Sequence, residues 1–258
     1  MPRGGKSDLV RRMKKTCYAG LSSPYRVYSD ACERLSSNAS AVLDVGCGRT
    51  IPVLSKLSLP KGALSVGIDL VASFDPPPES TAQLFRADCT SLPFDEEAFD
   101  LVVSRSVLEH LEHPEAAFAE LYRVLRPGGH AVILTPNWWD YVSLGSSLVP
   151  NRLHPWLVGR MTGRAEDDTF PTRYRANTTT RLAKLADNVG LRVVSLELPR
   201  EHPHYLQFNV LAYTVGLLYE QTVQRWCRKL RPWILATFQR PDRPSQTKHS
   251  PKTAEVKR

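Results

Sequence analysis

The sequence lacks an apolar segment long enough to cross a membrane as a helix. Its longest uncharged apolar run, residues 205–219, falls short of the ~20 residues that such a helix needs, and it contains Gln207, Asn209 and Thr214. The N-terminal charges are not followed by an apolar segment, so the pattern of a secretory signal peptide is also missing. We therefore expect a cytoplasmic protein.

Cysteines are few and widely spaced. The five are Cys17, Cys32, Cys47, Cys89 and Cys227, and none forms a Cys-x-x-Cys pair. Structural zinc sites and disulfide frameworks draw on closely spaced cysteines. The spacing argues against structural zinc, so we expect no metal, and it indicates a reducing compartment.

The body of the chain has no net positive charge, because the net charge of +8 is carried by the two ends. Residues 1–20 contribute +5 and residues 220–258 contribute +7, which leaves −4 between them. Basic ends either bind an anionic surface, such as the inner face of a membrane, or are solvated without a specific partner.

The length suits one decorated α/β domain, which we place at residues 21–239. Residues 1–20 are expected to be flexible or to form a loosely docked helix. Residues 240–258 are rich in Pro, Ser, Lys and Arg, and we expect them to be disordered.

The stretch Ala41–Thr50, Ala-Val-Leu-Asp-Val-Gly-Cys-Gly-Arg-Thr, predicts a buried strand that ends in a glycine turn. Gly46 and Gly48 let the backbone turn tightly and approach a ligand without a side chain in the way. In open α/β sheets, ligands bind beyond the carboxyl ends of the strands. The alternative is a tight turn that binds nothing.

Two further acids follow apolar runs. Asp69 lies about 20 residues past the glycines, where a carboxylate can accept both hydroxyls of a ribose. Asp88 ends a third run, where an acid could face an adenine amino group. A dinucleotide-binding fold shares these features, but its Gly-x-Gly-x-x-Gly pattern would need glycine at Ile51, so it fits less well.

With these residues, the chain resembles the class I S-adenosylmethionine-dependent methyltransferases of type 11/25, and within them the subgroup that includes ubiquinone- and menaquinone-pathway enzymes. The likeness covers residues 41–137 and includes Phe-Asp-Leu-Val-Val-Ser-Arg-Ser-Val-Leu-Glu-His at 99–110 and Leu-Tyr-Arg-Val-Leu-Arg-Pro-Gly-Gly at 121–129. It implies a Rossmann-like, mostly parallel seven-stranded sheet with an antiparallel last strand and helices on both faces. Thr50 departs from the family, which often has a third glycine there.

The resemblance also implies a site for S-adenosylmethionine at successive strand ends. Its expected residues are Asp44, Gly46, Cys47, Gly48, Asp69, Leu70, Asp88, Cys89, Ser104 and Arg105. Ser104 and Arg105 would border the methionine part, and Arg105 could pair with its carboxylate or with an anionic substrate. A short helix at 51–57 would point its first N–H groups at the site. Tyr25 and Tyr28 either contact the cofactor or pack in the core.

Methyl transfer is an in-line displacement that depends on positioning, and a base is needed only if the acceptor must lose a proton. His110 is the candidate base, because its near-neutral pKa suits proton removal and related quinone O-methyltransferases carry Leu-Glu-His here. His113 and His154 are further candidates. The alternative is that Glu109 and His110 only stabilise a helix end or a loop.

Two insertions are expected to act as lids over the site. The first insertion, residues 138–176, is rich in Trp and Arg, and the second insertion spans residues 199–231. The apolar run 205–219 and the basic cluster behind it predict a core helix, a membrane contact or lipid-tail groove, or a dimer interface.

The expected function is O-methylation of a small or lipid-like acceptor. Nucleic acid is disfavoured as a substrate, because the basic segments lie at the ends and an Asn/Asp-Pro-Pro-Tyr signature is absent. The alternatives are a non-catalytic module that binds the cofactor or recruits a membrane or partner, and an NAD(P)-dependent oxidoreductase.

Overall fold

A computed structural model describes residues 4–71, 73–140, 170–203 and 209–242. Within these ranges, seven strands form one sheet in the order β3-β2-β1-β4-β5-β7-β6. Their bounds are β1 Ala41–Val45, β2 Leu64–Asp69, β3 Gln83–Arg86, β4 Phe99–Arg105, β5 Leu125–Pro136, β6 Arg192–Glu197 and β7 Trp233–Gln239. Strand β7 is antiparallel to β5 and β6, and the other neighbours are parallel. The expected fold class is confirmed.

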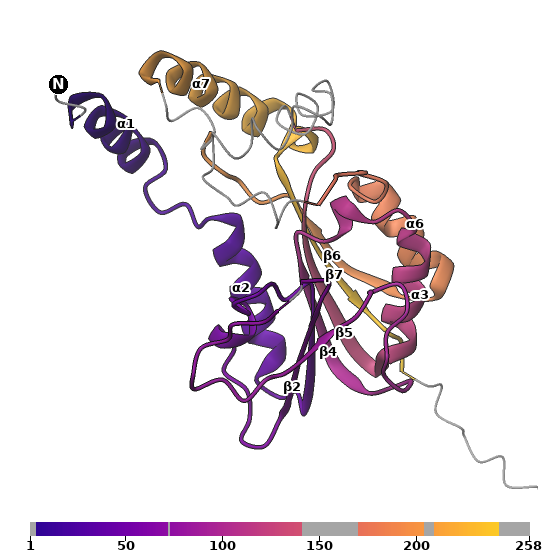
Figure 1. Ribbon diagram of the computed structural model, residues 1–258. Coiled ribbons are helices and arrows are strands. Elements are labelled where there is room, and N and C mark those ends of the chain that lie inside the picture. The colour runs from indigo at the N-terminus through magenta and orange to yellow at the C-terminus, as the bar shows by residue number, and fades with distance from the viewer. Residues whose placement is uncertain (1–3, 72, 141–169, 204–208, 243–258) are drawn as a thin grey trace, which may run out of the picture.

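Helices cover both faces of the sheet (Figure 1). Helix α2 (Pro24–Ser36) lies on one face, and α3 (Pro114–Val124) and α6 (Thr179–Val189) lie on the other. Helix α6 begins where the hydroxyl of Thr178 accepts a 3.2 Å hydrogen bond from the Arg181 N–H, and it ends at Gly190 in the left-handed conformation. Both signals, a threonine at the start of the helix and a glycine at its end, are typical of helix ends and are visible in the sequence.

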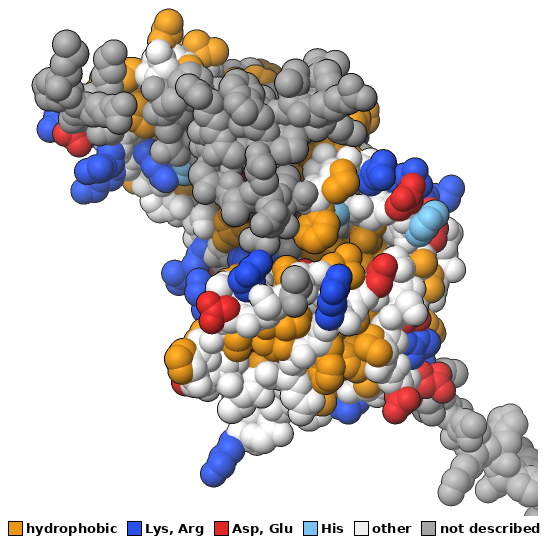
Figure 2. Space-filling view, in the orientation of Figure 1, with side chains coloured by type: hydrophobic (Ala, Val, Ile, Leu, Met, Phe, Trp, Pro, Cys, Tyr) orange, Lys and Arg blue, Asp and Glu red, His pale blue; other side chains and the backbone are white. Residues whose placement is uncertain are grey.

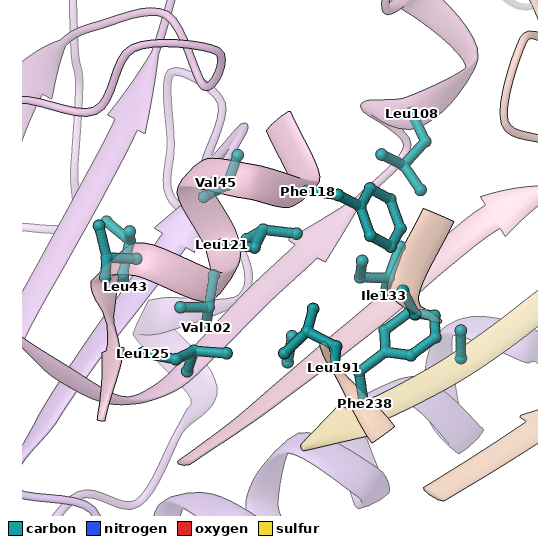
Figure 3. Close-up of a cluster of buried hydrophobic side chains, with 14 of the residues drawn as sticks. Leu43, Val45, Val102, Leu108, Phe118, Leu121, Leu125, Ile133, Leu191 and Phe238 are labelled. Carbon is teal, nitrogen blue, oxygen red and sulfur yellow. The ribbon is translucent and has the colours of Figure 1, made fainter. Parts of the chain in front are cut away.

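Each face of the sheet has its own hydrophobic cluster. On the α3 and α6 face, the rings of Phe118 and Phe238 meet edge to face with centroids 5.6 Å apart, close to Ile133 and Leu191 (Figure 3). On the α2 face, Tyr28 is fully buried in the second cluster. Tyr28 therefore packs in the core, which was one of its two expected roles.

The strand register gathers the carboxyl ends of the parallel strands at one edge. Val45, the last residue of β1, pairs with Ile68 of β2 and Ser104 of β4. The loops that leave these strands therefore start side by side, as a ligand site at this edge requires.

Both insertions are attached to this same edge. Strand β5 ends at Pro136 opposite Trp233, the first residue of β7. Strand β6 ends at Glu197, which is followed by the second insertion, and Glu197 pairs with Leu235 near the start of β7. The second insertion thus leaves and re-enters the sheet at the carboxyl edge.

The predicted helix at residues 51–57 is wrong. Only one 3-10 turn, η1 (Leu54–Lys56), forms there, and Ile51 has a φ of 45°. Pro52 disfavours helical backbone at the residue before it, so the chain cannot continue as a regular helix from Ile51. This segment therefore offers no N-terminal helix site for a ligand carboxylate.

Of the two expectations for the N-terminal segment, the structure has the docked helix. Helix α1 (Gly4–Cys17) packs through Val10 against Tyr213 and Leu217 of α7 (Val210–Trp226). None of the helices in the described ranges is both long and apolar enough to cross a membrane.

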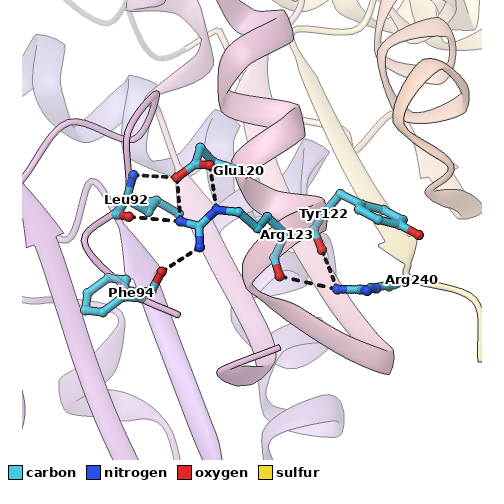
Figure 4. Close-up of polar contacts among 6 residues, drawn as sticks. All are labelled: Leu92, Phe94, Glu120, Tyr122, Arg123 and Arg240. Atoms are coloured by element: carbon cyan, nitrogen blue, oxygen red, sulfur yellow. Dashed lines mark hydrogen bonds and ion pairs between the residues drawn. The ribbon is translucent and has the colours of Figure 1, made fainter. Parts of the chain in front are cut away.

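The disordered tail was predicted to begin at Arg240, and this boundary is wrong. The Arg240 guanidinium donates to the backbone oxygens of Tyr122 at 3.0 Å and Arg123 at 3.3 Å (Figure 4). It also donates to the backbone oxygen of Leu125 at 2.7 Å and to Glu97 Oε1 at 2.9 Å. Its backbone N–H also donates to the oxygen of Gly129. Arg240 therefore belongs to the folded domain, while residues 243–258 lie outside the described ranges.

Candidate active site

The glycine turn after β1 is tightly packed against the turn after β4. Gly46 and Gly48 have φ values of 76° and 69°, which residues with a side chain rarely adopt. A Cβ added to Gly46 would lie 2.0 Å from Cγ2 of Val107, whereas one added to Gly48 would meet no atom within 4 Å. The protein therefore leaves no space beside Gly46 for a side chain, whereas the space beside Gly48 is free for a ligand.

Asp69 joins this turn to the end of β2. Its Oδ2 accepts a 2.7 Å hydrogen bond from the Gly48 N–H, and its Oδ1 accepts one of 3.2 Å from the Val71 N–H. Each carboxylate oxygen has a second lone pair, which a ligand hydroxyl can use. The structure thus places Asp69 beside the open part of the turn.

Asp44 is a fully buried acid at the same edge. Among the described residues, neither of its carboxylate oxygens has a hydrogen-bond partner. Burial raises its pKa to about 7, the positive charge of Arg105 acts in the opposite direction, and Asp69 raises it further. A buried carboxylate without partners is costly, so a cationic ligand group would be strongly stabilised here.

Arg105 extends from the end of β4 toward helix α2. Its guanidinium carbon lies 5.2 Å from the ring centroid of Tyr25, and that ring contacts Trp233 edge to face at 5.3 Å. Tyr25 therefore supports a site residue, a role that sequence reasoning had not specified.

The residues that we expect near the adenine, Leu70, Asp88 and Cys89, differ in exposure. The Oδ1 atom of the exposed Asp88 accepts two 2.8 Å hydrogen bonds, from the N–H and the hydroxyl of Thr90. Burial raises the pKa of Cys89 to about 12, and the charges of Asp88 and Asp69 act in the same direction. Leu70 is 47% exposed. Asp69 thus lies within electrostatic reach of both Asp44 and Cys89.

A small apolar cavity lies beside this edge, between the sheet and helix α3. Its lining residues are Val45, Cys89, Ser104, Val107, Leu108, Leu111, Ala117, Leu121 and Ile133. Cys89 and Ser104, both expected at the cofactor site, contribute to this wall, while Cys47 is buried in the turn itself.

His110 ends the 3-10 turn η2 (Leu108–His110), directly after β4. Its Nδ1 lies 3.1 Å from the carbonyl oxygen of Pro171, which can only accept, so Nδ1 carries the proton and Nε2 keeps its lone pair. Burial lowers the pKa of His110, which favours this neutral form. The rings of His110 and Phe170 also meet edge to face, with centroids 6.1 Å apart.

Of the other two histidine candidates, only His113 lies within the described residues. His113 is exposed at the residue before α3, where its side chain makes no helix-capping hydrogen bond. His154 lies outside the described residues, as does most of the first insertion.

A buried polar chain next to His110 was missed by the sequence reasoning. The hydroxyl of Thr135 donates to Oε2 of Glu109 at 3.1 Å and accepts from the side-chain amide of Asn177 at 2.7 Å. Burial raises the pKa of Glu109 to about 7. The available signal was a polar residue, Thr135, directly after the apolar residues 131–134 of β5.

The main chain of Glu109 also holds the end of the first insertion. Its carbonyl oxygen accepts hydrogen bonds from the N–H groups of Arg173 at 2.6 Å and Tyr174 at 3.0 Å. The Tyr174 ring in turn lies 5.3 Å from that of Trp138, at the start of the same insertion. The described ends of the first insertion therefore meet beside the turn that carries His110.

Asn137 links the two insertions and was likewise not singled out. Its side-chain amide donates to the backbone oxygens of Lys229 at 2.8 Å and Arg231 at 2.7 Å. Its N–H donates to the oxygen of Pro232 at 2.8 Å. The start of the first insertion and the end of the second are thus held together.

Comparison with known sequences identifies residues 43–133 as a match to the family described as "Methyltransferase domain". The ubiquinone/menaquinone biosynthesis C-methyltransferase of Cupriavidus pinatubonensis is 31% identical over 42% of this chain and 45% of that protein. The mitochondrial ubiquinone biosynthesis O-methyltransferase of Mus musculus is 35% identical over 45% of this chain and 36% of that protein. The corresponding Pseudomonas fluorescens enzyme is 26% identical over 66% of this chain and 82% of that protein. The chain spans less than half the length of the first two relatives.

Solved structures share the fold at low sequence identity. An S-adenosylmethionine-dependent methyltransferase of Mesorhizobium loti superposes with a TM-score of 0.54 and 17% identity, over 85% of this chain and 99% of that one. A methyltransferase from an activator complex of Haloferax volcanii gives 0.56 and 15% identity, over 92% and 95%. Residues 43–133 therefore match a methyltransferase domain, and the chain as a whole shares its fold with solved methyltransferases, among them an S-adenosylmethionine-dependent one.

Proposed function

We propose that the protein transfers a methyl group from S-adenosylmethionine to an oxygen atom of a small or lipid-like acceptor. The observation that carries this proposal is the buried carboxylate of Asp44, which has no hydrogen-bond partner among the described residues. The ammonium group of the cofactor's methionine part has the charge that this carboxylate needs. Arg105 beside it suits the carboxylate of the same methionine part.

The remaining cofactor contacts follow the same edge. Asp69 would accept the ribose hydroxyls with lone pairs that its bonds to Gly48 and Val71 leave unused. Leu70 and Cys89 would flank the adenine, with Asp88 at its amino group. When bound, the cofactor supplies an electrophilic methyl on a positively charged sulfur. The glycine turn and the three acids fix the position of that donor, and positioning contributes much of the rate of such a displacement.

His110 is proposed to remove the proton from the acceptor hydroxyl. The contact between its Nδ1 and the Pro171 oxygen leaves Nε2 as the basic atom. Its lowered pKa keeps the ring neutral at physiological pH, so the base is ready before the acceptor arrives. The buried Glu109 lies 3.9 Å from Nε2, too far for a hydrogen bond, and is proposed to keep the turn in place.

The acceptor is proposed to be a phenolic hydroxyl on a ring of the kind met in ubiquinone biosynthesis. Relatives named for O-methylation in that pathway support this class. Aromatic side chains near His110 also support it, because Phe170, Trp138 and Tyr174 could contact a flat ring. Relatives named for C-methylation make transfer to a ring carbon the second candidate.

The first test is calorimetry with S-adenosylhomocysteine, followed by methyl transfer to a short-chain dihydroxybenzene acceptor with product analysis by NMR. We expect binding by the wild type and a new O-methyl group in the product. A methyl on a ring carbon would favour the second candidate. Cofactor binding without transfer to any acceptor tried would favour a non-catalytic module, and binding of NADH instead would favour an oxidoreductase.

The second test separates the histidines. His110→Gln should lower turnover by about 10²-fold or more while S-adenosylhomocysteine affinity stays unchanged. His113→Gln is the matched control, because His113 is exposed before α3. Equal turnover in both variants would contradict the role of His110.

A further inference from the structure

Helix α7 presents an apolar stripe to solvent. Leu211, Val215, Leu218 and Trp226 are 73%, 59%, 59% and 79% exposed. Their spacing of four, three and eight residues places them on one side of an α-helix, with exposed Thr222 in the same row. Four large apolar side chains in one row, all exposed to solvent, indicate an interaction site.

The opposite side of α7 is used for folding. Tyr213 and Leu217 are buried there against Val10 of α1, and Glu220, the acidic residue of this helix, is 2% exposed. The apolar stripe is therefore not needed to hold α7 in place, and no acidic side chain of α7 reaches the surface.

Positive charge lies at the Trp226 end of the stripe. The Arg225 guanidinium lies 6.0 Å from the Trp226 ring, and Arg228 and Lys229 are exposed in the next turn, η5 (Arg228–Leu230). Figure 2 shows apolar side chains at the end of the molecule where α7 lies and basic side chains near α1. Helix α1, which packs on the opposite side of α7, adds the exposed Arg11, Arg12, Lys14 and Lys15 to this end of the molecule.

We propose that the stripe and the basic residues at its end, Arg225, Arg228 and Lys229, form a docking surface for an anionic lipid bilayer. An amphipathic helix of this kind lies in the plane of the interface with its apolar row among the lipid headgroups and upper chains. Trp226 suits that depth, since tryptophan concentrates at membrane interfaces. The lysine and arginine side chains would bind anionic headgroups, and this attraction weakens with salt.

Two other partners fit the surface less well. A second copy docked through the same face would bring the basic clusters of both copies together, and like charges repel. A nucleic acid would neutralise the cations but leave the row from Leu211 to Trp226 in water. A bilayer with anionic lipid satisfies both features.

The position of this surface gives it a consequence for the site. Helix α7 belongs to the second insertion, which leaves the sheet at the same edge as the cofactor site and is held to the first insertion by Asn137. Docking through α7 would thus bring the acceptor side of the protein near the lipid phase. The docking proposal itself does not depend on methyl transfer.

The test is flotation of the full chain with phosphatidylcholine vesicles that either contain or lack phosphatidylglycerol. We expect the wild type to float only with the anionic vesicles. The combined Leu218→Gln and Trp226→Gln variant should reduce the bound fraction by about tenfold. The matched control is Leu64→Gln with Val194→Gln, two substitutions of exposed apolar residues on the sheet, which should float like the wild type.

A second variant tests the contribution of the basic residues. Replacement of Arg225, Arg228 and Lys229 by Gln should also reduce flotation. Replacement of Arg34, Lys56 and Lys61, which are exposed on other elements, removes the same charge and should not. S-adenosylhomocysteine calorimetry on every variant checks folding and keeps a failure of docking distinct from a failure of the proposed enzymatic activity.

Several results would overturn the proposal. One is a wild type that does not float with anionic vesicles, or floats equally with neutral ones. Another is an equal loss in the control variants. A dimer in sedimentation velocity that the Leu218→Gln and Trp226→Gln variant abolishes would assign the stripe to a second copy. Tight binding of duplex DNA that depends on Arg225 and Arg228, with no flotation, would assign the cations to nucleic acid.

Discussion

The backbone N–H of Gly48 donates a 2.7 Å hydrogen bond to Oδ2 of Asp69. The two residues are 21 positions apart. Gly48 follows β1 and Asp69 is the last residue of the adjacent β2, so the bond connects the glycine turn to the acid that would accept the ribose hydroxyls. The shape of the turn and the orientation of that carboxylate are therefore set together, before a ligand binds. Such pre-organisation lowers the entropic cost of binding.

Replacement of Asp69 by Ala should weaken S-adenosylhomocysteine binding by about 10- to 100-fold, since hydrogen bonds to a charged group contribute about 1.5–3 kcal/mol each. The Asn variant should also bind more weakly, because its side chain has one acceptor oxygen where Asp69 has two. Calorimetry measures both. Asp75→Asn, an exposed change in the loop after β2, is the control. Unchanged affinity in the Ala variant would refute the assignment of Asp69.

The buried Asp44 predicts a pH dependence of cofactor binding. Its pKa is raised to about 7, so below that pH the carboxyl is largely protonated and cannot pair with an ammonium group. Affinity for S-adenosylhomocysteine should therefore rise between about pH 6 and 8 and level off above. The Asp44→Asn variant should bind S-adenosylhomocysteine weakly at every pH in this range. A wild-type affinity that does not change over this range would contradict the pairing.

Asp44 also predicts how the stability of the ligand-free protein depends on pH, and this trend is opposite to that of cofactor affinity. The folded-state pKa of Asp44 lies above its ordinary value of 3.8, so the folded state keeps a proton that the unfolded state loses. The free energy of unfolding should fall as the pH rises from about 4 to 7. Asp44→Asn should reduce this slope. The buried Glu109 and the half-buried Glu201, whose pKa values are also raised to about 7, should maintain the rest. Urea titrations at several pH values would measure it, and an identical slope in the variant would rule out Asp44 as a source.

Gly46 and Gly62 form a matched pair for backbone strain. Both have positive φ, but an added Cβ at Gly46 would meet Val107 at 2.0 Å, whereas one at Gly62 would meet nothing within 4 Å. Gly62→Ala should cost about 1–2 kcal/mol for the left-handed backbone alone, and Gly46→Ala about 1–3 kcal/mol more for overpacking. Val107→Ala combined with Gly46→Ala should recover part of that difference in a double-mutant cycle. Equal costs at the two glycines would show that the close approach is not tight.

Arg240 predicts where the folded domain ends. Its side chain is 13% exposed and bonds to backbone oxygens at the end of α3 as well as to Glu97. A chain ending after Gln239 should lose about 2–3 kcal/mol of unfolding free energy relative to one ending after Asp242. Arg240→Leu should reproduce the loss in the full chain, and the exposed Arg34→Leu should change it little. Equal stability of the two truncated chains would restore the tail boundary at Arg240.

Much of this fold could be predicted from local patterns, because its strands and helices carry their own signals. The apolar run up to Val45 with Gly46 behind it defines β1, and Pro114 and Gly190 mark the beginning of α3 and the end of α6. The helix predicted at residues 51–57 is the exception, because it does not form. Pro52 disfavours helical backbone at Ile51, which has a φ of 45° instead.

The sequence by itself determined the order of elements, the sheet class and the acids at successive strand ends, because these depend on neighbours a few positions apart. Only the tertiary structure decided that Asp44 is buried without a partner beside Arg105 and that Thr135 joins Glu109 to Asn177. It also decided that Arg240 is folded and that the apolar side of α7 faces solvent. These features depend on contacts between residues far apart in the chain, and such contacts are fixed only when strands and helices have packed together.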